Sequence, residues 1–357
     1  MEQLRQALAG VVPEALGVDL ISAGALKHLE EDDQRVIVEI VLGFPFDRVR
    51  EQYETQIRQA LEPVLDGRQL ALRLGREIVS HRCQNDMPAM DQVRNVIAVA
   101  SGKGGVGKST TAVNLALALQ AEGARVGILD ADIFGPSQPI MLGLPTDTRP
   151  EVIEQRLFMP VMAHGLQSMS MGYIVSEQQA VVFRGPKASG ALQQLIGQTR
   201  WQDLDYLIVD MPPGTGDIQL TLAQQVPVAG AVVVTTPQDI ALLDARKGIE
   251  MFRKVGIGVL GIVENMAVHV CSNCGHVEHV FGEGGGSRIA EQYQTGLLGS
   301  LPLSLTIREQ ADGGRPTVLA APDSTEAGIY HDVARRLAGR LSLQAPGKQA
   351  FPKVVTE

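Results

Sequence analysis

The stretch SGKGGVGKST at residues 101–110 constrains the fold of this chain more than any other feature. It contains Gly102, four further residues, and then Gly107, Lys108 and Ser109, which is the complete spacing of a phosphate-binding loop. The apolar run VIAVA precedes it and TAVNLALAL follows it, so we expect a strand before the loop and a helix after it. A loop in this context predicts an α/β protein that binds a nucleoside triphosphate.

Each part of this loop has an expected role in binding ATP and Mg²⁺. The glycines leave room for backbone N–H groups to surround the phosphates. Lys108 neutralises the β- and γ-phosphate oxygens, the Ser109 hydroxyl holds Mg²⁺, and Thr110 reaches the α-phosphate. The predicted nucleotide-binding residues of the loop are Gly102, Lys103, Gly104, Gly105, Val106, Gly107, Lys108, Ser109 and Thr110.

Five short apolar runs indicate the strands of one large sheet. They are VIAVAS at 96, ARVGILDAD at 124, DYLIVDMPPG at 205, AGAVVVTTP at 229 and IGVLGIVEN at 257. Runs that are apolar throughout are typical of parallel strands buried on both faces. We therefore predict a doubly wound, mostly parallel α/β domain over residues 96–345. The stripe of Tyr330, Val333, Leu337 and Leu341 predicts a last helix that packs on this sheet.

The first 80 residues predict a separate, small α+β domain. The strand-like RVIVEIVL at 35–42 precedes a segment with apolar residues four apart, and the strand-like LALRL follows that segment. The polar residues 81–95 have no apolar periodicity and are interpreted as a linker. Residues 346–357, which include two prolines, are interpreted as a C-terminal tail.

Composition and charge exclude several classes of protein. A hydrophobic content of 45% over 357 residues indicates a folded chain of two domains. The formal net charge of −9 disfavours a nucleic-acid partner, because binding to phosphate backbones requires clustered Lys and Arg. No apolar run is long enough to span a bilayer, and the N-terminus does not have the pattern of a signal peptide. Three cysteines favour a reducing compartment, so we expect a cytoplasmic protein with no membrane partner.

Cys271 and Cys274, in VCSNCGHVEHVF, have the spacing of a metal-binding knuckle. The tight turn between two such cysteines directs both sulfur atoms at one point, which suits a soft metal. The pair supplies only half of the donors that a tetrahedral site requires. Two unliganded thiols, a redox dithiol, and a zinc site completed by His276 and His279 remain alternatives at this point. Cys83 stands alone in the predicted linker and is not expected to be a ligand.

Lys103 is unusual, because a phosphate-binding loop needs one lysine and a second cation beside the phosphates would repel the first. The sequence KGGVGKST resembles the deviant Walker A motif of the superfamily that includes MinD, ParA and the nitrogenase iron protein. The resemblance implies that Lys103 crosses a homodimer interface to the nucleotide of the other subunit. There it would act as an arginine finger does, countering charge on the transferring phosphoryl group.

Further motifs resemble the same superfamily. Asp132, in ILDADIFGPS, matches the aspartate that orients the attacking water, so the predicted catalytic residues are Lys103, Lys108 and Asp132. Asp210, in LIVDMPPGTGD, resembles a Walker B aspartate close to Mg²⁺ and its waters. Gly214 follows in a loop able to sense the γ-phosphate. The resemblance assigns the adenine-side contacts to Asn265 and Pro302.

The motifs DADIFGPS, MPPGTGD, ENM and CSNCGH, followed by FGEGGG, are together similar to the Mrp/ApbC family of ATP-dependent iron-sulfur cluster carriers. The similarity implies a homodimer in which Cys271 and Cys274 of both subunits hold a bridging [4Fe-4S] cluster. Cluster donors and iron-sulfur apo-proteins would then be its partners. The N-terminal domain resembles the domain often fused before these ATPases, but its segment LGFPFDRVRE lacks a cysteine, which favours docking of a partner over cluster transfer.

A zinc-bridged positioning ATPase of the MinD or ParA kind, without cluster chemistry, is the main alternative. The C-terminal tail has no membrane-targeting helix, which disfavours MinD-like membrane binding. The acidic charge disfavours ParA-like DNA binding. An electron-transfer reductase like the nitrogenase iron protein is also disfavoured, since its cysteine ligands lie far apart in sequence.

Overall fold

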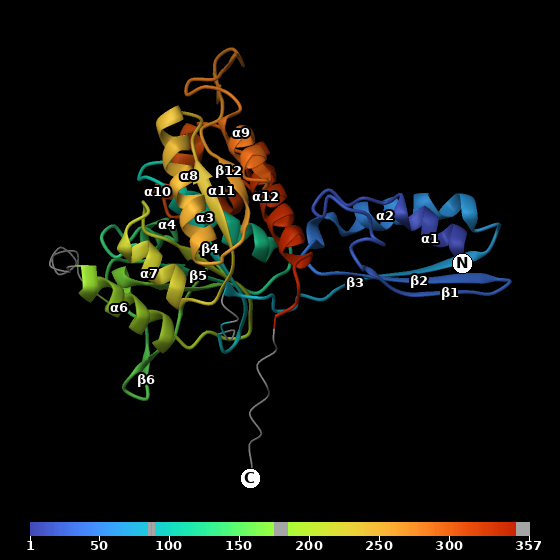
Figure 1. The fold of residues 1–357 in the computed structure, drawn as a ribbon, viewed down its shortest axis with the longest axis horizontal. Helices are drawn as coiled ribbons and strands as arrows, with labels where there is room; N and C mark the ends of the chain where they lie inside the picture. The colour runs from blue at the N-terminus through green and yellow to red at the C-terminus, as the bar shows by residue number, and fades with distance from the viewer. Residues whose placement is uncertain (85–86, 88–89, 175–184, 348–357) are drawn as a thin grey trace, which may run out of the picture.

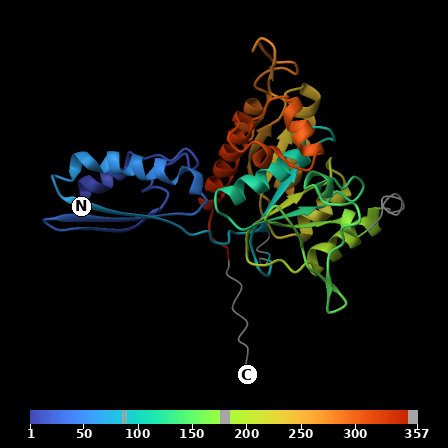
Figure 2. The same ribbon diagram turned by 180° about the vertical axis from the view of Figure 1, so that it is seen from behind.

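The computed structural model describes residues 1–84, 87, 90–174 and 185–347. Residues 348–357 of the predicted tail, and four positions of the predicted linker, lie outside this part. Figure 1 and Figure 2 show a large α/β domain with a smaller domain beside its last helix. Within the described ranges, no helix combines the length and the apolar character needed to cross a membrane.

The small domain consists of one sheet with helices on one of its faces (Figure 1). Its elements are α1 (Glu2–Ala9), β1 (Leu26–Glu31), β2 (Arg35–Leu42), the 3₁₀ helices η1 (Asp47–Val49) and η2 (Glu62–Val64), α2 (Arg50–Leu61) and β3 (Gln69–Arg76). Strand β2 lies between β1, which is antiparallel to it, and β3, which is parallel. Alternate residues of β2 are buried, as are Tyr53, Ile57 and Leu61 on one side of α2. The strand, helix and strand expected from the apolar pattern are all present.

The large domain contains the remaining elements. Its strands are β4 (Val93–Ala100), β5 (Val126–Asp130), β6 (Val152–Ile153), β7 (Leu157–Phe158), β8 (Val161–Ala163), β9 (Leu166–Ser170), β10 (Leu204–Asp210), β11 (Val228–Thr235), β12 (Val259–Glu264), β13 (His269–Val270), β14 (Val277–Glu278) and β15 (Leu297–Ser300). Its helices are α3 (Lys108–Ala121), α4 (Gln138–Met141), η4 (Met171–Tyr173), α6 (Gly185–Gln198), α7 (Asp217–Gln225), α8 (Asp239–Lys254), α9 (Gly285–Gln292), α10 (Leu305–Asp312), α11 (Thr317–Ala320) and α12 (Thr325–Ser342).

Eight strands form the main sheet in the order β15-β12-β11-β4-β10-β5-β9-β8. All neighbouring pairs are parallel except β8 and β9. The five predicted apolar runs form β4, β5, β10, β11 and β12, and β4 begins at Val93, three residues before the first run. The fold is the predicted doubly wound, mostly parallel α/β class.

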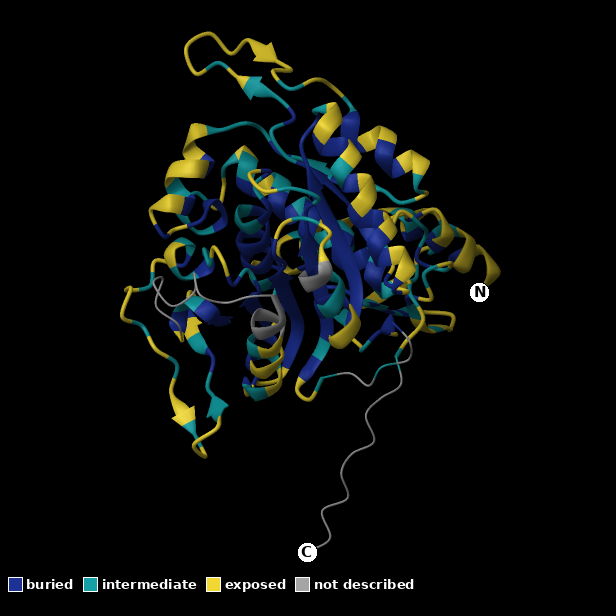
Figure 3. Ribbon diagram, turned by 60° about the vertical axis from the view of Figure 1, so that its left-hand side comes forward, coloured by how far each residue is buried: buried dark blue, intermediate teal, exposed yellow. Residues whose placement is uncertain are grey.

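Helices cover both faces of this sheet, and its central strands β10 and β11 are buried throughout (Figure 3). Successive residues of β4 face opposite sides, so Ile97 belongs to the core under α3 and α12, whereas Ala98 belongs to the core under α8. The predicted stripe on α12 is buried, and this helix packs on α3, on the edge strand β15 and on its neighbour β12.

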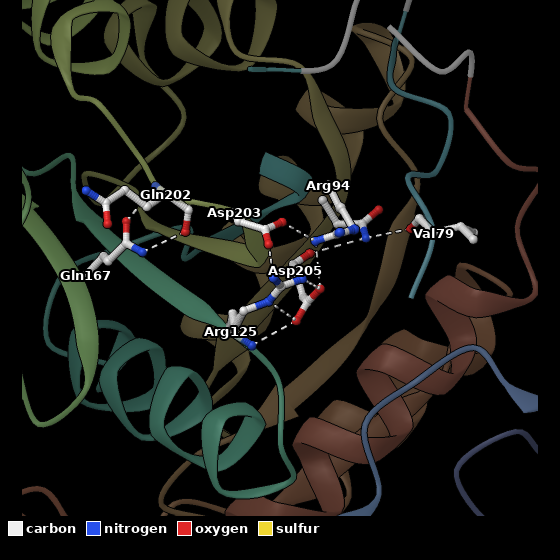
Figure 4. Close-up of polar contacts among 8 residues, drawn as sticks. Val79, Arg94, Arg125, Gln167, Gln202, Asp203 and Asp205 are labelled. Carbon is white, nitrogen blue, oxygen red and sulfur yellow. Dashed lines mark hydrogen bonds and ion pairs between the residues drawn. The ribbon is translucent and has the colours of Figure 1, made fainter. Parts of the chain in front are cut away.

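Charged residues pin the amino ends of three neighbouring strands together, as Figure 4 shows. Asp205 on β10 accepts hydrogen bonds from Arg94 on β4 at 2.9 Å and from the Arg125 guanidinium before β5 at 3.0 Å. Asp203 forms ion pairs with the same two arginines. Ion pairs therefore connect the amino ends of these strands. The loops at the opposite, carboxyl ends carry the predicted site.

Several residues of the segment interpreted as a linker are hydrogen-bonded near the amino ends of the strands. Asn95 accepts a hydrogen bond from the backbone N–H of His81 and donates one to the Val79 carbonyl, both close to 3 Å. The buried Gln84 side chain accepts from the backbone N–H of Val228 at 2.8 Å. Cys83 is buried too, with Sγ 3.3 Å from the Pro227 carbonyl oxygen. The polar residues of this segment therefore make hydrogen bonds to distant parts of the chain.

The two domains meet at the C-terminal end of α3. Glu122 is fully buried there and forms an ion pair with Arg335 of α12. Its carboxylate accepts a hydrogen bond from the backbone N–H of Arg48 at 3.1 Å, and its carbonyl accepts from Asp47 at 3.1 Å and from Arg76 at 2.9 Å. The helix that begins at the phosphate-binding loop therefore ends in a buried contact with the small domain.

His331 of α12 is buried beside this junction, and its two ring nitrogens have no hydrogen-bond partner among the described residues. Its Nδ1 lies 3.6 Å from the Glu122 carboxylate, beyond hydrogen-bond distance. Burial, together with the positive charges of Arg48 and Arg335, lowers the pKa of His331 to about 4. The imidazole is therefore neutral in the folded protein at neutral pH.

We expect His331 to make the protein less stable as the pH falls from about 6.5 to about 4, because only the unfolded chain protonates it in that range. His331→Phe should reduce this acid-induced loss in the free energy of unfolding by up to about 3 kcal/mol. Urea unfolding at several pH values measures the effect, with the exposed His28→Phe as control. An unchanged pH dependence in His331→Phe would show that this histidine does not couple folding to protonation.

Candidate nucleotide site and metal knuckle

The phosphate-binding loop connects β4 to α3, which begins at Lys108. Gly107 has a φ of 84°, in the left-handed region, and a β-carbon on it would lie 2.1 Å from the Asn265 amide nitrogen. A β-carbon on Gly102 would lie 2.2 Å from the backbone carbonyl of Asp244 in α8. Both positions therefore require glycine because neighbouring elements approach the loop closely.

The other predicted loop residues differ in burial. Gly104 and Gly105 are exposed, Val106 is buried, and Thr110 is half-buried in the first turn of α3. The Lys103 side chain is half-buried, and its ammonium forms no hydrogen bond or ion pair with any described residue. It is thus available to a group outside this chain.

Lys108 is buried at the centre of a compact charged cluster. Its ammonium forms an ion pair with Oδ1 of Asp210, the last residue of β10, and lies 3.1 Å from the Ser109 hydroxyl. Asp210 has no exposed surface, and a buried carboxylate requires such partners. The loop lysine and the two residues that the sequence assigns to Mg²⁺ therefore lie together.

A second buried carboxylate lies next to this cluster. The register of β5 and β10 pairs Asp130 with Asp210, and burial, followed by the negative charge of Asp210, raises the pKa of Asp130. Asp130 accepts hydrogen bonds at 2.9–3.1 Å from the Ser170 hydroxyl and from the backbone N–H groups of Asp132, Ser137 and Gln138. These bonds hold the loop that carries Asp132.

Asp132 lies at the start of this loop and is half-buried. Burial raises the pKa of its carboxyl, while the nearby charge of Lys108 opposes the rise. Its carboxylate accepts a hydrogen bond from the backbone N–H of Gly135 at 3.3 Å. Asp132 is therefore near enough to Lys108 for the charge of the lysine to act on its carboxyl.

Two further predicted residues, Gly214 and Asn265, are hydrogen-bonded to the loop, and the structure shows no such contact for Pro302 among the described residues. Gly214 donates its backbone N–H to the Ser101 carbonyl at 2.9 Å, which joins the segment after β10 to the start of the phosphate-binding loop. The Asn265 side chain donates to the Val106 carbonyl at 2.9 Å. Pro302 follows β15, and the segments after β12 and β15 are hydrogen-bonded to each other. Asn265 thus supports the loop directly, a contact that the sequence did not predict.

Gln138, the first residue of α4, is a site residue that the sequence analysis missed. Its side chain is 1% exposed, and its amide nitrogen donates to Asp210 at 2.8 Å and to the Ser109 carbonyl at 3.1 Å. One glutamine between Ser137 and Pro139 belongs to no motif with a chemical meaning. Only the folding of α4 against the β10 end reveals it.

Cys271 and Cys274 lie in the turn of a short hairpin formed by β13 and β14, which projects from the body of the large domain (Figure 1). The turn closes through hydrogen bonds from Gly275 to the Cys271 carbonyl at 2.8 Å and from Cys271 to the His276 carbonyl at 2.9 Å. Both thiols are free, and Cys274 is exposed. Hydrogen bonds from the backbone N–H groups of Cys274 and then Asn273 lower the pKa of Cys271, which favours the thiolate that binds metals.

The two histidines of the zinc alternative lie near acidic residues. Nε2 of His276 is 3.8 Å from Glu278, and Nε2 of His279 is 3.8 Å from Glu283. In the described part of the chain, no three or more His, Cys, Asp or Glu side chains are grouped so that they could hold a metal ion. One chain therefore contributes a pair of thiols at this hairpin.

Both domains match protein families that are described by iron transfer or iron-sulfur cluster assembly. A family described as a NUBPL iron-transfer P-loop NTPase matches residues 92–338, and a family described as an iron-sulfur cluster assembly protein matches residues 1–70. An iron-sulfur cluster carrier protein of Escherichia coli strain K12 is 50% identical over 360 residues, covering 99% of this chain and 97% of the relative. The chain belongs to the iron-sulfur cluster carrier family of P-loop NTPases.

A second curated relative and two solved structures are also similar to this chain. A Pseudomonas fragi iron-sulfur cluster carrier protein is 64% identical over 72% of this chain and 90% of its own length. A nucleotide-binding protein of Archaeoglobus fulgidus, solved with ADP, has a TM-score of 0.56 and 38% identity over 63% of this chain and 88% of that chain. The septum site-determining protein MinD of Pyrococcus horikoshii, with a TM-score of 0.53 and 22% identity over 67% of this chain and 94% of that chain, shares the fold.

We expect Gly107→Ala to weaken ATP binding by about tenfold or more, because a left-handed alanine costs roughly 1–2 kcal/mol and its β-carbon also displaces Asn265. Gly328→Ala, in α12 and outside the loop, is the control, since a β-carbon there also meets nothing within 4 Å. Titration with a fluorescent ATP analogue measures both affinities. Equal affinities in the two variants would contradict the role given to the Gly107 backbone.

Proposed function

We propose that this carrier binds ATP and an iron-sulfur cluster as a homodimer, hydrolyses the ATP, and passes the cluster to apo-proteins. The observation that carries the proposal is the pair of free thiols, Cys271 and the exposed Cys274, on a hairpin that begins a few residues after Asn265. Asn265 itself supports the phosphate-binding loop. The nucleotide site and the cluster ligands are therefore joined by a short, continuous segment. Cysteines that remain free thiols fit a reducing compartment, for which we propose the cytoplasm.

The number of ligands supports the homodimer. A [4Fe-4S] cluster binds four thiolates, whereas one hairpin supplies only Cys271 and Cys274. Two-fold symmetry brings the same pair from a second copy, which completes the set without any other residue. Exposure of the hairpin also leaves the cluster open to donors and to the apo-proteins that receive it. A zinc-bridged positioning ATPase would use the same thiols but would have no cluster to transfer.

Mg²⁺ fits the nucleotide site, because it prefers hard oxygen ligands such as the Ser109 hydroxyl and the Asp210 carboxylate, which lie on either side of the Lys108 ammonium. Bound Mg²⁺ would neutralise charge on the phosphate oxygens. Phosphate oxygens would compete with Asp210 for Lys108, and the freed carboxylate could then hold water at the metal. Gly214, Asn265 and Pro302 complete the proposed nucleotide contacts.

Hydrolysis requires a group that orients water and a charge that stabilises the transferring phosphoryl group. We assign the first role to Asp132, whose loop is fixed by hydrogen bonds to Asp130. We assign the second to Lys103 of the opposite subunit, since its ammonium has no partner among the residues described in its own chain. One symmetric dimer therefore accounts for both the extra lysine and the incomplete thiol set.

Mixing two inactive variants tests whether Lys103 acts across the interface. Lys103→Ala and Asp132→Ala should each lose most ATP turnover, with about 10³- to 10⁵-fold as the limit for a finger residue. A mixed dimer has one site that combines an intact Asp132 with Lys103 from the other chain, so activity should return on subunit exchange. No recovery in a mixture that demonstrably contains heterodimers would contradict the assignment.

Substituting the hairpin cysteines tests the cluster site separately. Cys271→Ser or Cys274→Ser removes two of the four thiolates from each dimer, so cluster binding should collapse while ATP binding persists. Iron and sulfide analysis with visible absorbance, after anaerobic reconstitution, measures the first effect, and nucleotide titration measures the second. Cys83→Ser is the control and should retain the cluster.

His276→Ala and His279→Ala distinguish the cluster from zinc. They should leave the iron and sulfide content unchanged, because thiolates already occupy the ligand positions of the cluster. Loss of metal from both histidine variants, with zinc as the bound metal in the unchanged protein, would favour the zinc alternative.

A further inference from the structure

Gln138 occupies a position that a neutral side chain rarely takes. It is buried where two buried carboxylates, Asp130 and Asp210, lie on adjacent strands. Its backbone N–H donates to Asp130 at 3.0 Å, and its side-chain nitrogen donates to Oδ2 of Asp210 at 2.8 Å. The same nitrogen lies 3.1 Å from the Ser109 carbonyl. One residue therefore connects the loop after β5, the end of β10 and the first turn of α3.

The two oxygens of Asp210 have different partners. Lys108 contacts Oδ1, whereas Gln138 holds Oδ2. A phosphate group that drew Lys108 away from Oδ1 would leave the bond from Gln138 to Oδ2 in place. Gln138 would then be the remaining side chain that orients this carboxylate.

The amide oxygen of Gln138 provides an independent observation. Oε1 is buried and has no hydrogen-bond partner among the described residues. An unsatisfied buried acceptor is costly, and such atoms mark places where water or an ion belongs. Mg²⁺ keeps several water ligands when it binds a nucleotide, and each of them is a hydrogen-bond donor.

We propose that Gln138 is a positioning residue of the magnesium–nucleotide site, where its nitrogen orients Asp210 and its oxygen accepts a hydrogen bond from a metal-bound water. The inference rests on the proposed ATP-binding function and adds to it the residue that sets the affinity for the metal. Residues that orient metal ligands in this way typically change metal affinity by ~10- to 100-fold when they are replaced.

ADP binding to the full-length protein, titrated with Mg²⁺ and repeated in EDTA, tests the proposal. Gln138→Met keeps the length of the side chain and the backbone bond to Asp130 but removes both polar groups. It should raise the Mg²⁺ concentration for half-maximal effect by ~10- to 100-fold and leave ADP affinity in EDTA unchanged. Gln138→Glu should lower ADP affinity in EDTA, because its carboxylate adds negative charge beside Asp210. Mg²⁺ should restore the ADP affinity of this variant.

The matched control is Gln84→Met, which removes another buried, hydrogen-bonded amide far from the charged cluster. It should leave the Mg²⁺ dependence unchanged. A wild-type Mg²⁺ response in both Gln138 variants, or an equal loss of ADP affinity with and without Mg²⁺, would overturn the proposal for Gln138. Neither result would contradict the proposed ATP binding. If the unchanged protein itself showed no Mg²⁺-dependent nucleotide binding, the proposed function would fail as well. Should Gln138→Met not fold, the reversal in Gln138→Glu decides the question.

Discussion

The ion pair between the buried Lys108 ammonium and the Asp210 carboxylate is the interaction on which the site at the carboxyl ends of the strands depends. The parallel register of β5 and β10 pairs Asp130 with Asp210, and both carboxylates are inaccessible to water. Negative charge on two such neighbouring groups is unfavourable, so burial and the charge of Asp210 raise the pKa of Asp130. The cation of Lys108 and the hydrogen bonds of the surrounding loops offset the cost of burying the two carboxylates. The phosphate-binding loop, the Asp132 loop and α4 all take their positions from this cluster. A nucleotide that draws Lys108 away from Asp210 therefore acts on every loop that depends on that carboxylate.

The chain runs from the carboxyl end of β12 directly to the thiol pair. Asn265 follows β12, donates to the Val106 carbonyl of the phosphate-binding loop, and is followed six residues later by Cys271. At its other end, α3 reaches the buried Glu122 and the small domain. The phosphate-binding loop is thus connected to the thiol hairpin through Asn265 and to the small domain through the length of α3. We propose that these connections couple ATP binding to the cluster ligands.

Local pattern was sufficient for much of the fold and site. The five apolar runs became buried strands because parallel strands between two helical layers have no polar face, and the spacing of SGKGGVGKST allows one backbone path. Residues whose role depends on distant partners could not be recognised. Val93 starts β4 although Arg94 and Asn95 interrupt the apolar run, because both polar side chains bond to the neighbouring strand and segment. Gln138 has no meaning until α4 packs against Asp210.

We propose that two copies of this chain share one cluster through four thiolates, Cys271 and Cys274 of each copy. Native mass spectrometry of the anaerobically reconstituted protein measures this, because it counts subunits and metal atoms in the same particle. We expect a dimer that carries a single [4Fe-4S] cluster, together with cluster-free monomers or dimers. A monomer that carries its own cluster, or a dimer that carries zinc in place of iron and sulfide, would contradict it.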